Sequence, residues 1–242
     1  MERFIRSALL IGEDNIQKLA DKTVMIFGCG GVGSYVIEGL ARTAIKNFIL
    51  IDNDTVSISN INRQLIATTE SIGKLKVDVC KERILSINPS ANIITYNNFI
   101  LPETINNIDF SNVDFVVDCI DTISGKLAII EKAKSNNIKV ISSMGTGNKL
   151  DPTLFKIVDI SKTNTCPLAK VMRYELKKRN IKDVPVLFSE EIPIDLSTSS
   201  LEQKLLNEEN SVKHQIPGSI SFVPSIAGLL IARYVILKLI ER

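Results

Sequence analysis

The sequence predicts an α/β fold in which a mainly parallel sheet is wound doubly by helices. Short apolar runs with the length of buried parallel strands alternate with helix-like segments as far as about residue 142. A glycine-rich turn over residues 28–33 joins the first apolar run to the first of these helices. Together these observations are typical of a Rossmann-like nucleotide-binding fold.

The expected elements follow one another in the order that such a sheet requires. Met1 to Asp21 carries both charge signs and predicts one amphipathic helix rather than a signal peptide. The expected strands of the parallel part are residues 23–27, 47–51, 92–96, 113–118 and 138–142, and the expected helices are residues 32–44, 74–87 and 124–135. Because ligands bind such sheets at the carboxyl ends of the strands, we expect the functional residues there.

The pattern changes after Met144. We expect an antiparallel strand over 154–160, a helix over 167–179, short strands over 185–189 and 219–223, and a closing helix. Residues 192–217 are polar and lack periodicity, which predicts a mobile loop. We therefore predict a single domain of residues 1–242, with a nucleotide-binding half to residue 150 and a substrate-side half from residue 151.

Composition narrows the class of protein. The formal net charge of +2 neither proves nor excludes a nucleic-acid partner, because a local patch can act while the total stays small. Four scattered cysteines and one histidine, His214, argue against a disulfide framework and a zinc site, and suit a reducing cytoplasm. The apolar stretch from Phe222 to Ile240 contains Pro224, Arg233 and Lys238, so a buried closing helix fits it as well as or better than a membrane-spanning helix. A peripheral membrane association through this helix stays open.

The glycine loop and the following strand predict a nucleotide site. Gly28, Gly30 and Gly33, with Gly31 beside them, have the spacing that brings backbone N–H groups and a helix N-terminus against a phosphate. Asp52 lies roughly 20 residues further on, where such folds place an acid that accepts hydrogen bonds from ribose. A dinucleotide and a mononucleotide both fit this part of the pattern.

Three further residues favour a triphosphate over NAD. Arg63 can bind phosphate through two hydrogen bonds, and Lys76 can place a point charge on another oxygen. Asp121 follows a predicted strand and can hold Mg²⁺ beside substrate phosphates through one carboxylate. These groups suit ATP and the activation of a carboxylate, whereas an NAD-dependent oxidoreductase would leave them without a function.

Several motifs resemble those of the ThiF/MoeB group of the ubiquitin-activating-enzyme-like superfamily. They are Gly28-Cys29-Gly30-Gly31-Val32-Gly33-Ser34, Asp52-Asn53-Asp54, Ser59-Asn60-Ile61-Asn62-Arg63-Gln64, Gly73-Lys74-Leu75-Lys76, Ile87-Asn88-Pro89 and Asp118-Cys119-Ile120-Asp121. Later motifs at 141–152, 159–163, 166–169 and 217–224 are similar to the branch of tRNA threonylcarbamoyladenosine dehydratases. The resemblance covers nearly the whole chain.

This resemblance implies an activity. ATP would activate the carboxylate of threonylcarbamoyladenosine beside the tRNA anticodon, as an acyl-adenylate or an acyl-phosphate, and the side chain would cyclise with net loss of water. It also implies Mg²⁺, a homodimer and a cytoplasmic location, and leaves a sulfur-relay protein partner open. The alternative is an adenylyltransferase that activates a ubiquitin-like sulfur carrier, but such relatives generally carry paired C-x-x-C zinc motifs, which this sequence lacks.

The resemblance assigns roles to individual residues. Gly28, Gly30, Gly31 and Gly33 would line the nucleotide, Asp52 would hold the ribose, Asn60, Arg63 and Lys76 would contact phosphates, Gln64 would belong to the same site, and Asp121 would hold magnesium. Arg6, or else Arg3, would reach into the ATP site of the partner subunit and complete the catalytic set with Arg63, Lys76 and Asp121. Asp54 fits three roles equally: a metal ligand, a ribose ligand, or the acceptor of an Asx-type turn.

Two features stay open between function and structure. Cys166 precedes a predicted helix, whose positive end favours a nucleophilic thiolate, but a buried structural cysteine fits the same position. Lys170, Arg173 and Lys177 lie at i, i+3 and i+7 on one predicted helix. Such a face fits tRNA phosphates or plain solvent, and the resemblance favours tRNA.

Overall fold

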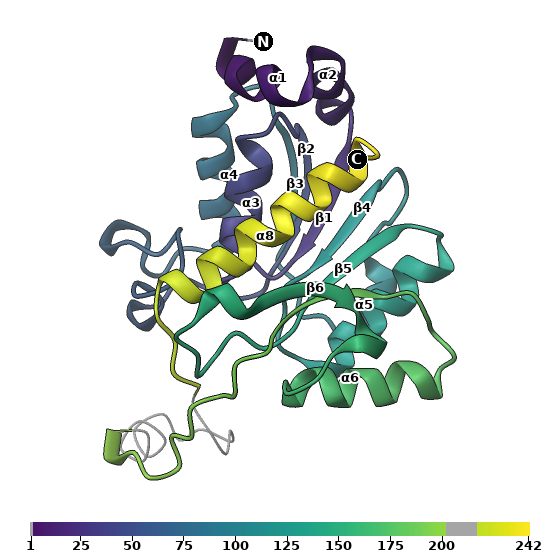
Figure 1. Ribbon diagram of the computed structural model, residues 1–242. Coiled ribbons are helices and arrows are strands. Elements are labelled where there is room, and N and C mark those ends of the chain that lie inside the picture. Colours follow the sequence, from purple (N-terminus) through teal and green to yellow (C-terminus); the bar gives the residue numbers. More distant parts are fainter. Residues whose placement is uncertain (1, 202–216) are drawn as a thin grey trace.

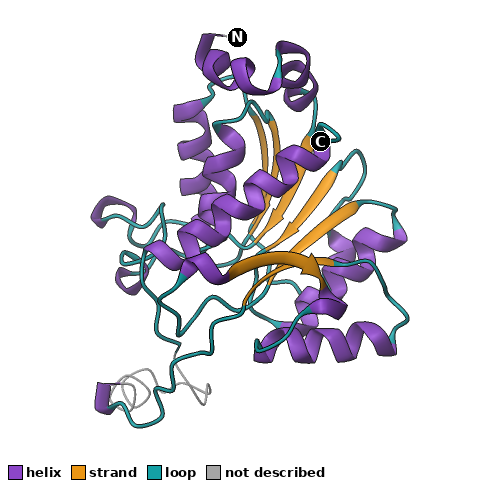
Figure 2. Cartoon of the chain, viewed as in Figure 1, coloured by secondary structure: helices purple, strands orange, loops and turns teal. Residues whose placement is uncertain are grey.

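A computed structural model describes residues 2–201 and 217–242. In this part of the chain, seven strands form one sheet in the order β3-β2-β1-β4-β5-β7-β6 (Figures 1 and 2). The strands are β1 (Thr23–Phe27), β2 (Asn47–Ile51), β3 (Asn92–Tyr96), β4 (Phe115–Asp118), β5 (Lys139–Ser143), β6 (Phe155–Asp159) and β7 (Pro185–Ser189). Neighbours run parallel except β6 and β7, which are antiparallel. The predicted doubly wound sheet with an antiparallel extension is confirmed.

Helices cover both faces of the sheet. They are α1 (Ile5–Ile11), α2 (Glu13–Ala20), α3 (Gly33–Ala41), α4 (Lys76–Ile87), α5 (Ile123–Ser135), α6 (Pro167–Lys178) and α8 (Phe222–Leu239). α3, α4 and α8 pack on one face and α5 and α6 on the other, while α1 and α2 lie at the end of the sheet opposite α6 (Figure 1). The sheet is therefore the middle of three layers.

The inner strand β1, which lies between β2 and β4, shows why the strands are nearly continuous apolar runs. Val24 and Ile26 belong to the core under α3, α4 and α8, whereas Met25 and Phe27 belong to the core under α5 and α6. Successive side chains of a strand point to opposite faces, so a strand covered on both sides must be apolar at every position.

The closing helix α8 packs tightly on α3. A Cβ added at Gly228 would lie 2.4 Å from the carbonyl oxygen of Val32, and one added at Gly39 of α3 would lie 2.7 Å from the Cβ of Ala232. By length and composition alone, α8 could cross a membrane. Its Gly228 and Ala232 side is nevertheless buried inside the protein, as in a core helix.

Two element predictions are wrong. The N-terminal helix divides into α1 and α2 at Gly12, whose φ of +89° leaves the helical region. Residues 219–223 form no strand, because Phe222 and Val223 already belong to α8. Pro224 sits in the first turn of that helix, where a missing N–H costs no hydrogen bond. The predicted loop over 192–217 lies partly outside the described residues, as does His214.

Candidate functional site

The carboxyl ends of β1, β2, β4 and β5 open into a cavity of about 660 Å³. β1 lies between β2 and β4, so the strand order reverses here, at the point where open α/β sheets bind ligands. Of the residues predicted from sequence, the cavity is lined by Gly28, Gly30, Gly31, Asp52, Asp54, Asn60, Arg63, Gln64, Lys76 and Asp121. The fold thus brings most of the predicted set to one place.

The glycine loop forms one wall of the cavity. Gly28 has a φ of +89°, and a Cβ there would lie 2.9 Å from the carbonyl carbon of Cys119. A Cβ at Gly30 would meet nothing closer than 3.7 Å, so the loop is open to a ligand at that position. A Cβ at Gly33 would lie 1.8 Å from the Gly28 oxygen, and Gly33 lies outside the cavity wall. Gly33 therefore packs tightly beneath the loop, and its expected contact with a nucleotide stays a prediction.

Asp52 is fixed by two backbone groups. Cys29 N donates to its Oδ2 at 2.6 Å, and Asp54 N donates to its Oδ1 at 2.8 Å. Burial raises the pKa of Asp52, and the charge of Lys76 and these two hydrogen bonds offset the rise only in part. Each carboxylate oxygen keeps a lone pair that can accept a ribose hydroxyl. The hydrogen bond of the Asx-type turn in this segment is therefore accepted by the carboxylate of Asp52 and not by that of Asp54.

Asp54 pairs with Lys76. Lys76 Nζ lies 2.6 Å from Asp54 Oδ2. The lysine is only 5% exposed, whereas the Asp54 side chain is 58% exposed, so the carboxylate keeps much of its water. Because an ammonium group has three N–H donors, Lys76 can contact a phosphate as well as Asp54. The structure therefore gives Asp54 a role that the sequence did not suggest, which is to hold the Lys76 ammonium at the cavity.

The turn after Asp54 presents amide and guanidinium groups. Asn60 Oδ1 accepts from Ser57 N at 3.2 Å, and its Nδ2 has no partner in the described part of the chain. Arg63 Nη1 donates to the Ser59 carbonyl at 2.7 Å, and burial lowers the pKa of this guanidinium. Gln64 is buried beside Gly30, and its Oε1 lacks a hydrogen-bond partner among the described residues. The side-chain N–H groups of Asn60, Arg63 and Gln64 can therefore donate to the phosphates of a ligand. The Gln64 Oε1 atom can only accept a hydrogen bond.

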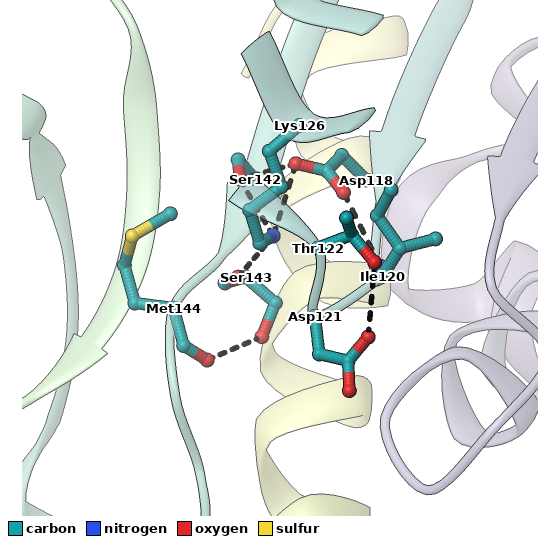
Figure 3. Close-up of polar contacts among 8 residues, drawn as sticks. All are labelled: Asp118, Ile120, Asp121, Thr122, Lys126, Ser142, Ser143 and Met144. Carbon is teal, nitrogen blue, oxygen red and sulfur yellow. Dashed lines mark hydrogen bonds and ion pairs between the residues drawn. The ribbon is translucent and has the colours of Figure 1, made fainter. Parts of the chain in front are cut away.

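Asp118 and Lys126 form a buried ion pair beneath the cavity (Figure 3). Both side chains are fully buried, with Lys126 Nζ 3.0 Å from Asp118 Oδ2. The same Nζ donates to Ser142 Oγ at 3.2 Å and to the Ser143 carbonyl at 2.7 Å, so all three of its donors are used. This network links α5 with β4 and β5 and makes Asp118 structural. The sequence interpretation missed Lys126, a charged residue directly before the apolar run of α5.

Asp121 points away from that network (Figure 3). Its carboxylate is exposed at the cavity, and the hydrogen bond that it accepts from Thr122 Oγ1 is long at 3.5 Å. Among the described residues, no three His, Cys, Asp or Glu side chains gather as a metal site. A bound divalent cation would therefore need ligands from the substrate, which fits Mg²⁺ held by one carboxylate and phosphate oxygens.

Arg6 and Arg3 lie away from this cavity. Arg6 is exposed on α1, at the far end of the sheet (Figure 1). Arg3 borders a second cavity, of about 560 Å³, together with Lys46 and Asn88. Within the described chain, neither arginine lines the cavity of the glycine loop. Either one could complete an ATP site only across a subunit contact.

The three basic residues of α6 are not equivalent. Lys170 and Lys177 are exposed, but Arg173 is half-buried and its Nη1 donates to the carbonyl and the hydroxyl of Thr163, each at 2.7 Å. Arg173 thus fastens α6 to the preceding turn. Of the predicted face, the two lysines are the charges turned to solvent.

Two further residues line the cavity. Cys166 is buried at the N-terminal end of α6, which is compatible with both a nucleophilic and a structural role. Lys149 also lines the cavity and is only 4% exposed. The sequence interpretation did not single out Lys149, because its burial depends on segments distant in the chain.

The ThiF family pattern matches residues 3–242. The chain belongs to the ThiF family. It is 40% identical over 244 residues to the tRNA threonylcarbamoyladenosine dehydratase of Bacillus subtilis, across 100% of this chain and 96% of that protein. It is 34% identical over 259 residues to dehydratase 2 of Saccharomyces cerevisiae, across 100% of this chain and 58% of that protein.

The fold of this ThiF family chain is similar to a crystal structure of Escherichia coli TcdA, a tRNA N6-threonylcarbamoyladenosine dehydratase, in complex with ATP. The TM-score is 0.87 at 30% sequence identity, with 99% of this chain and 94% of that chain covered. The family predicted from the motifs is confirmed. The individual site residues stay predictions.

Proposed function

We propose that this ThiF family enzyme is an ATP-dependent tRNA threonylcarbamoyladenosine dehydratase. The observation that carries the proposal is the 40% identity to the Bacillus subtilis enzyme of that name over both chains nearly in full. The cavity supports it, since the glycine loop lines it and its volume of about 660 Å³ also takes in residues of the second half of the chain, such as Lys149 and Cys166.

We infer that ATP lies along the glycine loop. Asp52 would hold the ribose, and the open backbone at Gly30 would face the phosphates. Arg63 and Lys76, with Asn60 and Gln64, would neutralise or hydrogen-bond the triphosphate. Magnesium held by Asp121 would supply charge neutralisation at the phosphates.

The reaction then has two stages. A carboxylate oxygen of the substrate attacks a phosphorus of ATP, which gives an acyl-adenylate and pyrophosphate, or an acyl-phosphate and ADP. The carbamoyl group then attacks the acyl carbon, the phosphate leaving group departs and one proton is released, so the nucleoside loses one water in total. The attack is intramolecular, so the enzyme needs chiefly to activate and orient the substrate.

A direct assay tests this function. The protein is incubated with ATP, Mg²⁺ and tRNA that carries threonylcarbamoyladenosine, and the digested nucleosides are weighed by mass spectrometry. We expect a nucleoside lighter by one water. The Asp121→Ala variant should keep the wild-type circular dichroism spectrum, because its carboxylate is exposed, and should lose at least about a hundredfold in rate. ATP-dependent adenylation of a sulfur-carrier protein without any change in the tRNA would favour the rival activity instead.

We propose that tRNA contacts α6. Lys170 and Lys177 are exposed there, and Tyr174 between them is 67% exposed, so the helix offers charges for phosphates and a ring on which a base can stack. Arg173 supports this surface by holding the Thr163 turn.

We propose that the enzyme is a homodimer. α1 exposes apolar side chains beside Arg6: Ile5 is 45% exposed, Leu9 81% and Leu10 78%. A second copy that covers this face would bring Arg6 to the partner's ATP site. Complementation tests the idea: Arg6→Ala and Asp121→Ala should each be inactive, and mixing them should restore activity in about a quarter of the sites, because half the dimers are mixed and each has one intact site. No recovery on mixing would remove Arg6 from the partner's site.

We infer a cytoplasmic enzyme, since its substrate would be tRNA and α8 buries one side against α3. The sulfur-relay partner stays a prediction.

A further inference from the structure

The cavity holds three cations on its described walls: Arg63, Lys76 and Lys149. Arg63 and Lys76 lie beside the glycine loop and have partners, Ser59 and Asp54 respectively. Lys149 lines the same cavity from the segment after β5, and the charge of Cys166 acts on it. The site therefore offers a third positive charge besides the two next to the glycine loop.

Lys149 is a buried amine without a hydrogen-bond or ion-pair partner in the described part of the chain. The residue is 4% exposed. Among the residues that the structure describes, the buried side-chain polar atoms that lack both a partner and solvent are Gln64 Oε1 and Asn88 Nδ2. Since the Lys149 ammonium is not among them, it touches the solvent of the cavity. A cation in this position is stabilised only when an anion arrives.

Glu191, the carboxylate whose charge acts on Lys149, is hydrogen-bonded elsewhere. Glu191 Oε1 accepts from Leu150 N at 2.8 Å and its Oε2 accepts from Asp151 N at 3.0 Å, so both oxygens hold the backbone that follows the lysine. Burial lowers the pKa of Lys149, and Cys166 and Glu191 oppose this shift without cancelling it. The negative groups of the protein therefore do not fully offset the cost of burying the Lys149 ammonium.

The backbone around Lys149 is held from both sides. Asn148 N donates to the Gly218 carbonyl at 2.8 Å, and Gly218 N donates back to Asn148 Oδ1 at 2.6 Å. Ile194 N donates to the Asn148 carbonyl at 2.8 Å. With Glu191 fixing the next two residues, the position of Lys149 is set before any ligand binds. A cation held in place in this way is suited to recognise one group of a substrate.

We propose that the Lys149 ammonium binds the carboxylate of the threonylcarbamoyl group and so selects the modified nucleotide for activation. This inference rests on the proposed function. The carboxylate must approach a triphosphate of the same sign of charge, and the positive charge of Lys149 offsets that repulsion. Once the carboxylate is joined to phosphorus its charge is gone, and the ion pair to Lys149 ends with that step.

Binding measurements with two tRNAs test the proposal. One tRNA carries threonylcarbamoyladenosine and the other carries plain adenosine at the same position, each in the presence of a non-hydrolysable ATP analogue. We expect the wild type to prefer the modified tRNA and Lys149→Met to lose that preference. The KM for the modified tRNA should rise at least about tenfold, Lys149→Arg should recover part of it, and the affinity for the ATP analogue alone should be unchanged. Lys139→Met, at an exposed site on the other end of β5, serves as the matched control.

The outcomes separate this proposal from the proposed function. If the wild type leaves threonylcarbamoyladenosine unchanged, the proposed function is wrong. If the wild type converts it and a folded Lys149→Met keeps the preference and the KM, the role of Lys149 is wrong. Weakened binding of the ATP analogue by Lys149→Met would place the lysine on the nucleotide and also overturn the proposal. Thermal melting verifies that each variant is folded, and Lys149→Gln provides a second polar test.

Discussion

Lys126 and Lys149 are both buried near the cavity, yet their surroundings differ completely. The Lys126 ammonium donates all three of its hydrogen bonds, to Asp118, Ser142 and Ser143. The Lys149 ammonium, by contrast, has no hydrogen-bond partner in the described chain, although the residue is 4% exposed. A lysine whose donors are all satisfied holds the protein together, because its loss leaves its partners stranded. A lysine that the fold leaves unsatisfied, while fixing the backbone around it, points to a ligand. Burial alone does not distinguish the two cases.

Replacing Lys126 should cause the largest loss of stability. Lys126→Met should lower the free energy of unfolding by about 3–5 kcal/mol, since Asp118 would stay buried without its counter-charge. Urea denaturation measures this loss, and Lys170→Met, at an exposed site on α6, should change the free energy of unfolding by less than about 0.5 kcal/mol. The double variant Asp118→Asn/Lys126→Met should recover part of the stability. A loss below about 1 kcal/mol for Lys126→Met would contradict the structural role of the pair.

Replacing Lys76 should lower the free energy of unfolding less than replacing Lys126 does. Its partner Asp54 is 58% exposed and can return to water, so Lys76→Met should destabilise the protein by only about 1 kcal/mol. The affinity for ATP should fall at least about tenfold, because one cation at the phosphates is gone. Calorimetry with a non-hydrolysable ATP analogue measures this, and Lys74→Met, an exposed neighbour, is the control. Unchanged ATP affinity would remove Lys76 from the phosphate site.

For Lys149 the expected change in stability is small and opposite in sign, and it depends on pH. The pKa of Lys149 is lower in the folded protein than its usual 10.5. Between these two values the unfolded chain binds the proton and the folded protein does not, so wild-type stability rises with pH across that window. Lys149→Met should therefore be the more stable protein at low pH, and its advantage should vanish as the pH approaches 10.5. Urea denaturation of the wild type and of Lys149→Met from pH 7 upward measures this difference, with Lys139→Met as the control. A difference in midpoint that does not change with pH would contradict the prediction.

The smallest effect on folding is expected on α6. Charge reversal at Lys170 and Lys177 should change the free energy of unfolding by less than about 0.5 kcal/mol, because both side chains are exposed. The affinity for tRNA should fall, and the slope of log Kd against log salt should decrease by about 1 for each phosphate that the helix no longer neutralises. Titration over a range of salt concentrations, with Lys139→Glu as the control, measures both. An unchanged slope would place the tRNA elsewhere.

The sequence predicted what depends on neighbours in the chain. The strand runs, the turn at Gly28 and the acid at Asp52 follow from periodicity and local turn geometry, and the structure brings them to one cavity. The break at Gly12 was missed, since the charge pattern continues through it.

What the sequence could not predict depends on distant contacts. Lys126 donates a hydrogen bond to Ser142, which is 16 residues away in the chain. Lys149 is left without a carboxylate partner because Glu191 accepts from the backbone of Leu150, 41 residues before it. Asp54 was left open because its partner Lys76 lies 22 residues further on. Contacts of this range are set by the assembled sheet and leave no periodic signal in the chain.

The close approach of Gly228 to the Val32 carbonyl places α8 directly against the end of the glycine loop. The segment that would cradle the triphosphate is therefore supported from outside by a helix far along the chain. An α8 displaced from α3 would leave the apolar side of α3 exposed and the glycine loop without this support. ATP binding should therefore depend on the docking of α8 as well as on the glycines themselves.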